Sequence, residues 1–277
     1  DFGTQGDPPS HQELLDYLAV DFAESGWDVK QLLSQIVLSA TYRQDSIRTV
    51  QLEKRDPQNR LLARGPRRRL PAEFVRDHAL SISGLLKEKL GGPGVHPYQP
   101  AELFGANAIG SSNARFAPSK GDDLYRRSLY TYWKRQIPAA NMRILGADGR
   151  TTCRTRRERT NTPLQALVLL NDPQFVEAAR VFAERIVREG GDTPEERLSF
   201  AFRLATSRRV KPAELSILLQ EYENRLTEFK ANHERAAQYL DGGGQHKPAA
   251  ESNHAELAAY AAVCSLIFNL DESISSS

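Results

Sequence analysis

Four prolines in the C-terminal half of the chain constrain its fold more than any other feature, because each follows a residue that can precede a helix. The four pairs are Thr162-Pro163, Asp172-Pro173, Thr193-Pro194 and Lys211-Pro212. Proline is favoured at the first helical position, where its fixed φ suits the helix and its missing N–H breaks no internal hydrogen bond. Apolar residues at helical spacing follow the last three pairs. The pattern therefore predicts four helices, one after another.

Helical patterns also occupy the N-terminal part of the chain and its C-terminal end. Ser10 and Glu13 have the spacing of a capping box, and apolar residues at helical spacing follow until Gly26. A second apolar face comes after a short gap, which predicts an antiparallel helix pair. Further helices are predicted over residues 71–90 and about 253–270.

Residues 91–161 interrupt this pattern with repeated glycines and prolines, and they predict a long, mostly irregular insertion that is rich in arginine. The glycine-rich stretch 241–250 predicts a flexible loop. We therefore predict a mainly α-helical, bundle-like single domain over residues 1–277. Its helical body is expected to consist of residues 10–90 and 162–270.

Composition and local motifs exclude several classes of protein. No uninterrupted apolar run reaches the roughly 20 residues that a membrane-spanning helix needs. Two cysteines, Cys153 and Cys264, are too few for a disulfide-rich scaffold or a four-cysteine zinc site, and no C-x-x-C-H haem attachment is present. The local signatures of phosphate-binding loops, dinucleotide sites, serine hydrolases and zincins are also missing. We predict no metal site and no cofactor in this chain.

Charge is distributed unevenly along the sequence. Residues 115–160 contain 12 basic and 4 acidic residues, whereas the formal charge of the whole chain is only +2. Residues 1–59 contain 5 basic and 10 acidic residues, and residues 161–277 are also acidic overall. The cationic middle could therefore dock against the acidic arms of its own chain, or its arginines could bind phosphate, sulfate or carboxylate groups.

The most informative local stretch begins at Arg157 and enters the helix predicted from Pro163. Arginines and a helix N-terminus both favour anions, so the stretch is the best candidate for a ligand site. A structural alternative is that these arginines lock the insertion onto the helical body. The candidate ligand-binding residues are Arg126, Arg127, Arg157, Arg159, Asn161, Gln165 and His11.

Several stretches carry a family resemblance: Asp1–Gly6, Ile36–Gln44, Asp123–Tyr130, Arg157–Leu167 and Asn269–Glu272. In them the chain resembles the planctomycete-type C-terminal domain of unknown function called DUF1553 or PSD1, which is found downstream of cytochrome-c-like domains. The resemblance implies an extracytoplasmic setting in the periplasm or cell envelope, with haem only in N-terminal domains that are absent from this chain. The resemblance does not imply an enzyme activity. It also implies that the family domain begins upstream of Asp1, so that an early helix pairing with residues 11–40 is expected there.

These observations lead to one functional hypothesis and two alternatives. The leading hypothesis is a non-catalytic interaction or scaffold module that binds an anionic glycan, or another domain of its parent protein, through the cationic middle. The first alternative is an enzyme, or the partner of one, in complex polysaccharide degradation or a redox pathway. The second is nucleic-acid binding, which tyrosines interleaved with arginines favour and the acidic arms disfavour.

Overall fold

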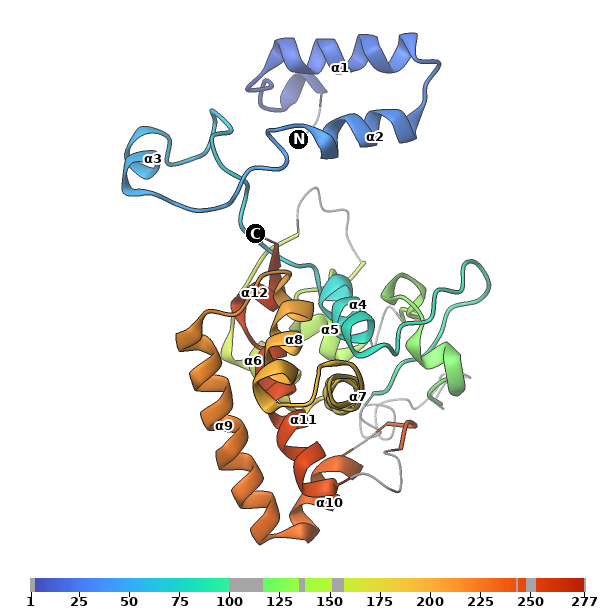
Figure 1. Cartoon of the computed structure of the whole chain (residues 1–277). Coiled ribbons are helices and arrows are strands. Elements are labelled where there is room, and N and C mark those ends of the chain that lie inside the picture. The colour runs from blue at the N-terminus through green and yellow to red at the C-terminus, as the bar shows by residue number, and fades with distance from the viewer. Residues whose placement is uncertain are drawn as a thin grey trace. The chain divides into compact units, whose positions relative to one another are not determined.

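The computed structural model of the chain describes residues 3–99, 117–134, 138–150, 157–242, 244–247 and 253–276. The protein is mainly α-helical, as the sequence predicts (Figure 1). Two compact units make up the chain, Asp1–Arg68 with Ser275–Ser277, and Arg69–Ile274. That residues 1–277 form a single domain stays a prediction.

The N-terminal unit contains a helical hairpin. Its elements are the 3-10 turn η1 (Gly3–Gln5) and the helices α1 (Gln12–Glu24), α2 (Val29–Leu38) and α3 (Val50–Arg55). The predicted pair of helices is confirmed in α1 and α2, which contact each other through a hydrogen bond of 3.1 Å from Gln35 Nε2 to the Tyr17 hydroxyl. The predicted cap is wrong, because the Ser10 hydroxyl interacts with Nδ1 of His11 and His11 itself precedes the helix.

Local interactions hold the turn between α1 and α2. Gly26 and Trp27 both have positive φ values, of 77° and 63°. The Trp27 N–H donates to the carbonyl of Phe22 at 3.0 Å, and the two rings meet edge to face with centroids 5.2 Å apart. The Asp28 carboxylate then accepts hydrogen bonds from the first backbone N–H groups of α2. The hairpin is therefore fixed by its own sequence.

The second unit contains the helices that the prolines predict. All four predicted starts are confirmed: α6 (Pro163–Asn171), α7 (Pro173–Glu189), α8 (Pro194–Thr206) and α9 (Pro212–Ala231) each have proline in the first turn. The predicted C-terminal helix is confirmed as α11 (His254–Phe268), for which Asn253 is the N-cap.

The remaining described elements lie in the second unit, except for β2 and Arg68 of β1, which belong to the N-terminal unit. They are α4 (Ala72–Ser83), the 3-10 turns η3 (Gly121–Tyr125) and η4 (Ser128–Tyr130), α5 (Ala140–Ile144), α10 (His233–Asp241), α12 (Asp271–Ile274), and the paired strands β1 (Arg68–Arg69) and β2 (Ser275–Ser276). The sequence analysis does not predict α5 or α10. In the part of the chain that the structure describes, no helix combines the length and apolarity needed to cross a bilayer.

The helix predicted over residues 71–90 is too long by about two turns. It ends at Ser83, because Gly84 adopts the left-handed conformation with a φ of 87° and no side chain to oppose it. The chain then turns, and the Lys87 N–H donates to the carbonyl of Tyr125 at 3.0 Å. Leu85 and Leu86 continue the helical spacing in the sequence only because they pack against the same core after the helix has ended.

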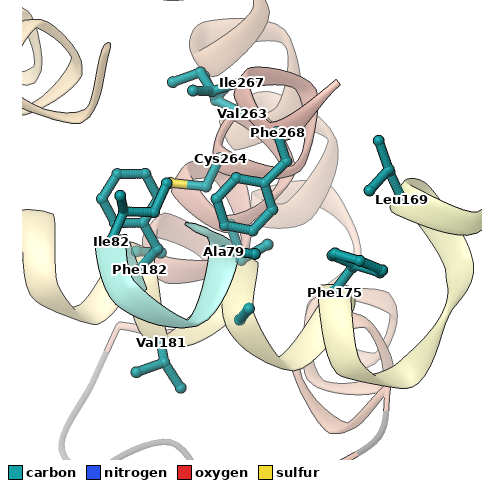
Figure 2. Close-up of a cluster of buried hydrophobic side chains, with 14 of the residues drawn as sticks. Ala79, Ile82, Leu169, Phe175, Val181, Phe182, Val263, Cys264, Ile267 and Phe268 are labelled. Carbon is teal, nitrogen blue, oxygen red and sulfur yellow. The ribbon is translucent and has the colours of Figure 1, made fainter. Parts of the chain in front are cut away.

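The core of the second unit lies around α7 and α11 (Figure 2). The α11 helix is apolar on nearly all sides and packs against α7, α9 and α10, while α4 covers another face of α7. Figure 2 shows Phe182 of α7 against Phe268 of α11, and their rings stack with centroids 5.8 Å apart. Cys264 is buried among these residues, and burial raises the pKa of its thiol.

Buried charged side chains attach the insertion to this core. Arg76 of α4 donates to Gln174 Oε1 at 2.5 Å, to the carbonyl of Leu124 at 2.6 Å and to the carbonyl of Arg126 at 2.9 Å. On α7, the Glu177 carboxylate accepts from the Tyr125 hydroxyl at 2.9 Å. Polar atoms of the insertion are thus satisfied by the helices, which allows irregular backbone to lie against a packed body.

Glu177 also binds the segment between α10 and α11. Its Oε1 accepts from the His246 N–H at 2.8 Å, and the ring of His246 lies 2.8 Å from Glu184 Oε2. A Cβ at Gly244, where φ is 91°, would come within 2.2 Å of the Glu177 side chain. His246, in the loop predicted over 241–250, is therefore hydrogen-bonded to α7, and the flexibility of the loop stays a prediction.

Candidate functional site

Two adjoining hollows of about 270 and 290 Å³ open on the second unit beside the start of α4. They share Gly146, Arg157, Glu158 and Thr160. The first is also lined by Arg69, Leu70, Pro71, Leu145 and Arg159, and the second by Arg143, Ile144, Ala147, Asp148 and Gly149. We call this pair the basic hollow, since four arginines line it.

Gln165 of α6 fixes one wall of the basic hollow. This side chain is only 1% exposed, and its amide donates to the carbonyl of Ile144 at 2.9 Å and to the hydroxyl of Thr160 at 3.0 Å. Its carbonyl oxygen accepts from the N–H of Thr162, the N-cap of α6. Gln165 therefore joins the segment before α6 to the end of α5, and it acts on the hollow by positioning these segments.

Glycine is required at one point of this wall. Gly146 has a φ of 92°, in the left-handed region, and a Cβ there would lie 3.8 Å from the carbonyl oxygen of Glu158. The backbone can therefore turn back from α5 toward the segment before α6 at this position. The turn brings Leu145 and Gly146 beside Arg157 and Thr160.

Two of the lining arginines are engaged. Arg157 Nη1 lies 2.8 Å from Glu73 Oε2, in the first turn of α4, and the Arg157 side chain stays partly exposed. Arg69 Nη1 donates to Asn161 Oδ1 at 3.3 Å. Burial lowers the pKa of Arg69 and the charge of Asp271 opposes this shift. Arg69 thus points a half-buried guanidinium at an uncharged amide oxygen.

The other two lining arginines are available to a ligand. Arg159 and Arg143 are exposed, and neither has an ion pair or a side-chain hydrogen bond among the residues that the structure describes. Guanidinium groups present a planar set of donors that matches carboxylate, sulfate and phosphate groups. Chemically, the basic hollow can bind an anionic group, and its Leu70, Pro71 and Leu145 side chains offer that ligand an apolar wall.

The structure places Arg126 elsewhere, in a structural position. It is 1% exposed and donates to the carbonyls of Pro93 at 3.1 Å and Lys89 at 2.9 Å, and to that of Gly91. Its guanidinium also lies over the ring of Tyr130, 3.9 Å from the centroid. Arg126 holds the segment after α4 and does not line the basic hollow.

The last two candidates also lie outside the basic hollow. Arg127 Nε is 3.7 Å from Asp77 Oδ2, an ion pair between the insertion and α4. His11 belongs to the N-terminal unit, where it precedes α1. Of the seven predicted residues, the structure therefore brings together Arg157, Arg159, Asn161 and Gln165.

Sequence reasoning missed Arg69, Arg143 and Gly146 as parts of this site. The run Arg67-Arg68-Arg69 is visible in the sequence, and Pro71 marks a helix start directly after it, so Arg69 had a signal. Arg143 had none, because α5 is too short to show a helical pattern. Arg154 and Arg156, which belong to the same cationic stretch of the sequence, lie outside the described residues.

A further hollow of about 200 Å³ lies between α9, α10 and α11, and it suits an anion less well. The charges on its rim neutralise one another, because Arg225 Nε lies 2.7 Å from Glu221 and Arg225 Nη1 lies 3.1 Å from Glu228. The hydrogen bond that Arg225 donates to Glu221 raises the pKa of Arg225. Arg235 forms an ion pair with the same Glu228. This rim is a closed set of ion pairs, in contrast to the basic hollow.

Comparison with known families gives one result. Residues 1–222 match the family PSD1, described as a protein of unknown function (DUF1553). A search of curated proteins and a search of solved structures each found no match. The chain belongs to the PSD1 family, as the sequence resemblance predicts.

Proposed function

We propose that this chain, as a member of the PSD1 family, is a non-catalytic interaction module that binds an anionic glycan in the basic hollow. The observation that carries the proposal is Arg159, an exposed arginine with no ion pair or side-chain hydrogen bond among the described residues, beside a hollow of about 270 Å³. A sulfate or carboxylate group would give this guanidinium the partner that the described residues do not supply.

The rest of the lining supports the same ligand class. Arg69 supplies a second guanidinium that is hydrogen-bonded to an amide oxygen. Leu70 and Pro71 form an apolar surface beside it, against which the face of a sugar ring can pack. Ligand sites typically combine such an apolar wall with a few placed polar groups.

The use of the remaining arginines favours a module over an enzyme. An enzymatic site lined by Arg126, Arg127, Arg157, Arg159 and His11 would need these groups to converge. Instead, Arg126 binds backbone carbonyls, Arg127 pairs with Asp77 and Arg157 pairs with Glu73. Arginines used in this way hold the insertion in place.

The proposed setting of this module follows from the family resemblance. We place it in an extracytoplasmic protein of planctomycete type, where haem-binding domains precede it in the parent chain. The other domains of the parent protein are its proposed partners.

Binding to polysaccharides tests this proposal. The chain would be titrated with dextran sulfate, polygalacturonate and neutral dextran, and Arg159→Ala would be compared with the parent chain. We expect binding to at least one of the two polyanions and none to dextran. Arg159→Ala should weaken that binding by about tenfold or more, since hydrogen bonds to charged groups are worth about 1.5–3 kcal/mol.

Arg209→Ala is the matched control, because Arg209 is also an exposed arginine of the second unit and does not line the basic hollow. This variant should bind as the parent chain does. Equal losses in the two variants would mean that the polyanion binds through general charge, and the proposal would be rejected. Absence of binding to both polyanions would reject it as well.

A further inference from the structure

The α1–α2 hairpin exposes apolar side chains that a helical hairpin would ordinarily bury. Neither helix contains a buried residue. Leu15 is 51% exposed on α1, and Leu33 is 55% exposed on α2. Large patches of exposed apolar surface are rare on soluble monomeric proteins, and they commonly mark interaction sites.

The exposed residues of α2 follow a helical stripe. Val29, Leu33, Ile36 and Val37 recur at spacings of three and four residues, so they share one face of the helix, and all four are exposed. Such a stripe is the form of surface that receives a second helix through interdigitating side chains. Isolated helices of this length are marginal in water, so burying the stripe is the expected source of their stability.

The hairpin is also preformed. The positive φ of Trp27, its contact with Phe22 and the Asp28 cap hold the turn by interactions within the hairpin itself. A partner therefore meets an arranged surface, and little ordering entropy is lost on binding.

Charge identifies the kind of partner. Residues 11–38 contain five acidic residues and a single basic one, Lys30. Glu13, Asp16 and Glu24 are exposed, and none of them forms an ion pair with another residue that the structure describes. Carboxylates of α1 that are left without cations favour a partner that supplies lysine or arginine.

We propose that the α1–α2 hairpin is a docking surface for an amphipathic helix whose polar face is basic. The apolar side chains of that helix pack on the stripe of α2, and its lysines or arginines pair with the carboxylates of the hairpin. This is the helix-on-apolar-face form of recognition. The surface is separate from the basic hollow and serves a partner of opposite charge.

The proposal is tested with Trp27 as the reporter. Trp27 is 69% exposed at the turn of the hairpin, and the chain contains one other tryptophan, so Trp133→Phe leaves it as the sole one. The probe is a synthetic helix of leucine and lysine, about 18 residues long, with its leucines at helical spacing. We expect a blue shift of Trp27 emission that saturates as the probe is added.

Two control peptides separate patterned docking from simple attraction. One has the same composition with the leucines spread around the helix, and the other has glutamate in place of lysine. We expect neither to shift Trp27 at the concentrations where the probe saturates. Equal binding by either control peptide, or no shift with the probe, would overturn the proposal.

Variants of the chain place the site. Leu33→Ser should weaken binding of the probe about tenfold, because burial of a leucine side chain contributes about 1.5–3 kcal/mol. Ile217→Ser, at an exposed position of α9, is the matched control and should change nothing. Glu13→Gln with Asp16→Asn should weaken binding and reduce its dependence on salt.

Sedimentation of the chain without the probe tests whether a second copy of the chain covers the stripe. A dimer that Leu33→Ser dissociates would mean that a second copy covers the stripe, and the proposal would then be wrong. A chain that stays monomeric and binds the probe supports it.

Discussion

Two groups of arginines in the second unit show how differently the same side chain can be used. Around Arg76 and Arg126, guanidinium groups are buried and donate to backbone carbonyls of the insertion. Around Arg69 and Arg159, in the basic hollow, they face open space, an amide or a single carboxylate. Burial of the guanidinium and the identity of its partner separate a structural arginine from one that is available to a ligand.

The difference also separates stability from binding. A buried guanidinium whose donors are satisfied cannot be removed without leaving several acceptors unsatisfied. An exposed guanidinium can be removed with little effect on the free energy of unfolding. Substitutions in the two groups should therefore have opposite consequences.

The largest effect is expected for Arg76→Leu. Burial lowers the pKa of Arg76 to about 10, and Asp77 and Asp172 oppose that shift, so the group stays charged near neutral pH. Its removal leaves the carbonyls of Leu124 and Arg126 and the side chain of Gln174 without their donor. We expect a loss of about 3–5 kcal/mol in the free energy of unfolding, measured by urea denaturation.

Arg127→Ala is the control for that experiment. Arg127 is adjacent in the insertion and pairs with Asp77 at 3.7 Å, but its side chain is about half exposed. Exposed ion pairs contribute about 0–1 kcal/mol, so the loss should be small. Similar losses in both variants would contradict the distinction between buried and exposed arginines.

A pH-dependent effect is expected next in size, at Asp172 beside Arg76. Burial raises the pKa of this carboxyl to about 6, against the opposing hydrogen bonds from Gln174 and Asn141 and the charge of Arg76. An unfolded aspartate loses its proton near pH 3.9, so the folded state holds more protons between about pH 4 and 6. Asp172 should therefore reduce stability as pH rises through this range, by up to about 3 kcal/mol.

Asp172→Asn should remove this contribution. Asparagine caps helices about as well as aspartate, so the N-terminus of α7 should be preserved. Urea denaturation of both proteins at pH 4.5 and pH 7 gives the measurement, and the variant should gain stability relative to the parent at the higher pH. A difference between the two proteins that is the same at both pH values would show that Asp172 does not titrate in this range.

Much of the helical body could be predicted from the sequence, because local signals determine it. The helices α6, α7, α8 and α9 each begin with proline in the first turn and a polar residue before it, and both signals are local. The helix predicted over 71–90 is wrong beyond Ser83, because the apolar spacing continues past Gly84 to Leu85 and Leu86 in the sequence. The spacing of apolar residues reflects which side chains are buried, and side chains continue to be buried after the helix has ended.

The candidate site was less predictable, for a physical reason. Arg157, Arg159, Asn161 and Gln165 lie in one stretch of sequence and could be found together. Arg126 lies in a different stretch, and the three carbonyls that accept hydrogen bonds from it belong to residues 89–93. Tertiary contacts determine which arginines are engaged in structural hydrogen bonds and which are available to a ligand.

A smaller effect on stability is expected for Arg157→Ala, which lies between the two groups. Its pair with Glu73 at 2.8 Å joins the segment before α6 to α4, and both side chains are partly exposed. The loss should be about 0.5–1 kcal/mol by urea denaturation. Glu73→Gln should cost a similar amount, and the double variant should cost less than the sum, since the two changes remove one interaction. Additive losses would show that the pair contributes nothing.

The smallest effect on stability, together with a clear effect on binding, is expected for Arg159. Removal of this exposed guanidinium should change the free energy of unfolding by less than about 0.5 kcal/mol, because it has no partner among the described residues to lose. Binding to the preferred polyanion should nevertheless fall by about tenfold or more, and Arg159→Lys should restore only part of it, since lysine keeps the charge and loses the planar donors. Full recovery with lysine would show that the basic hollow responds to charge alone. A stability loss as large as that of Arg76→Leu would place Arg159 among the structural arginines, and the contrast between the two groups would then fail.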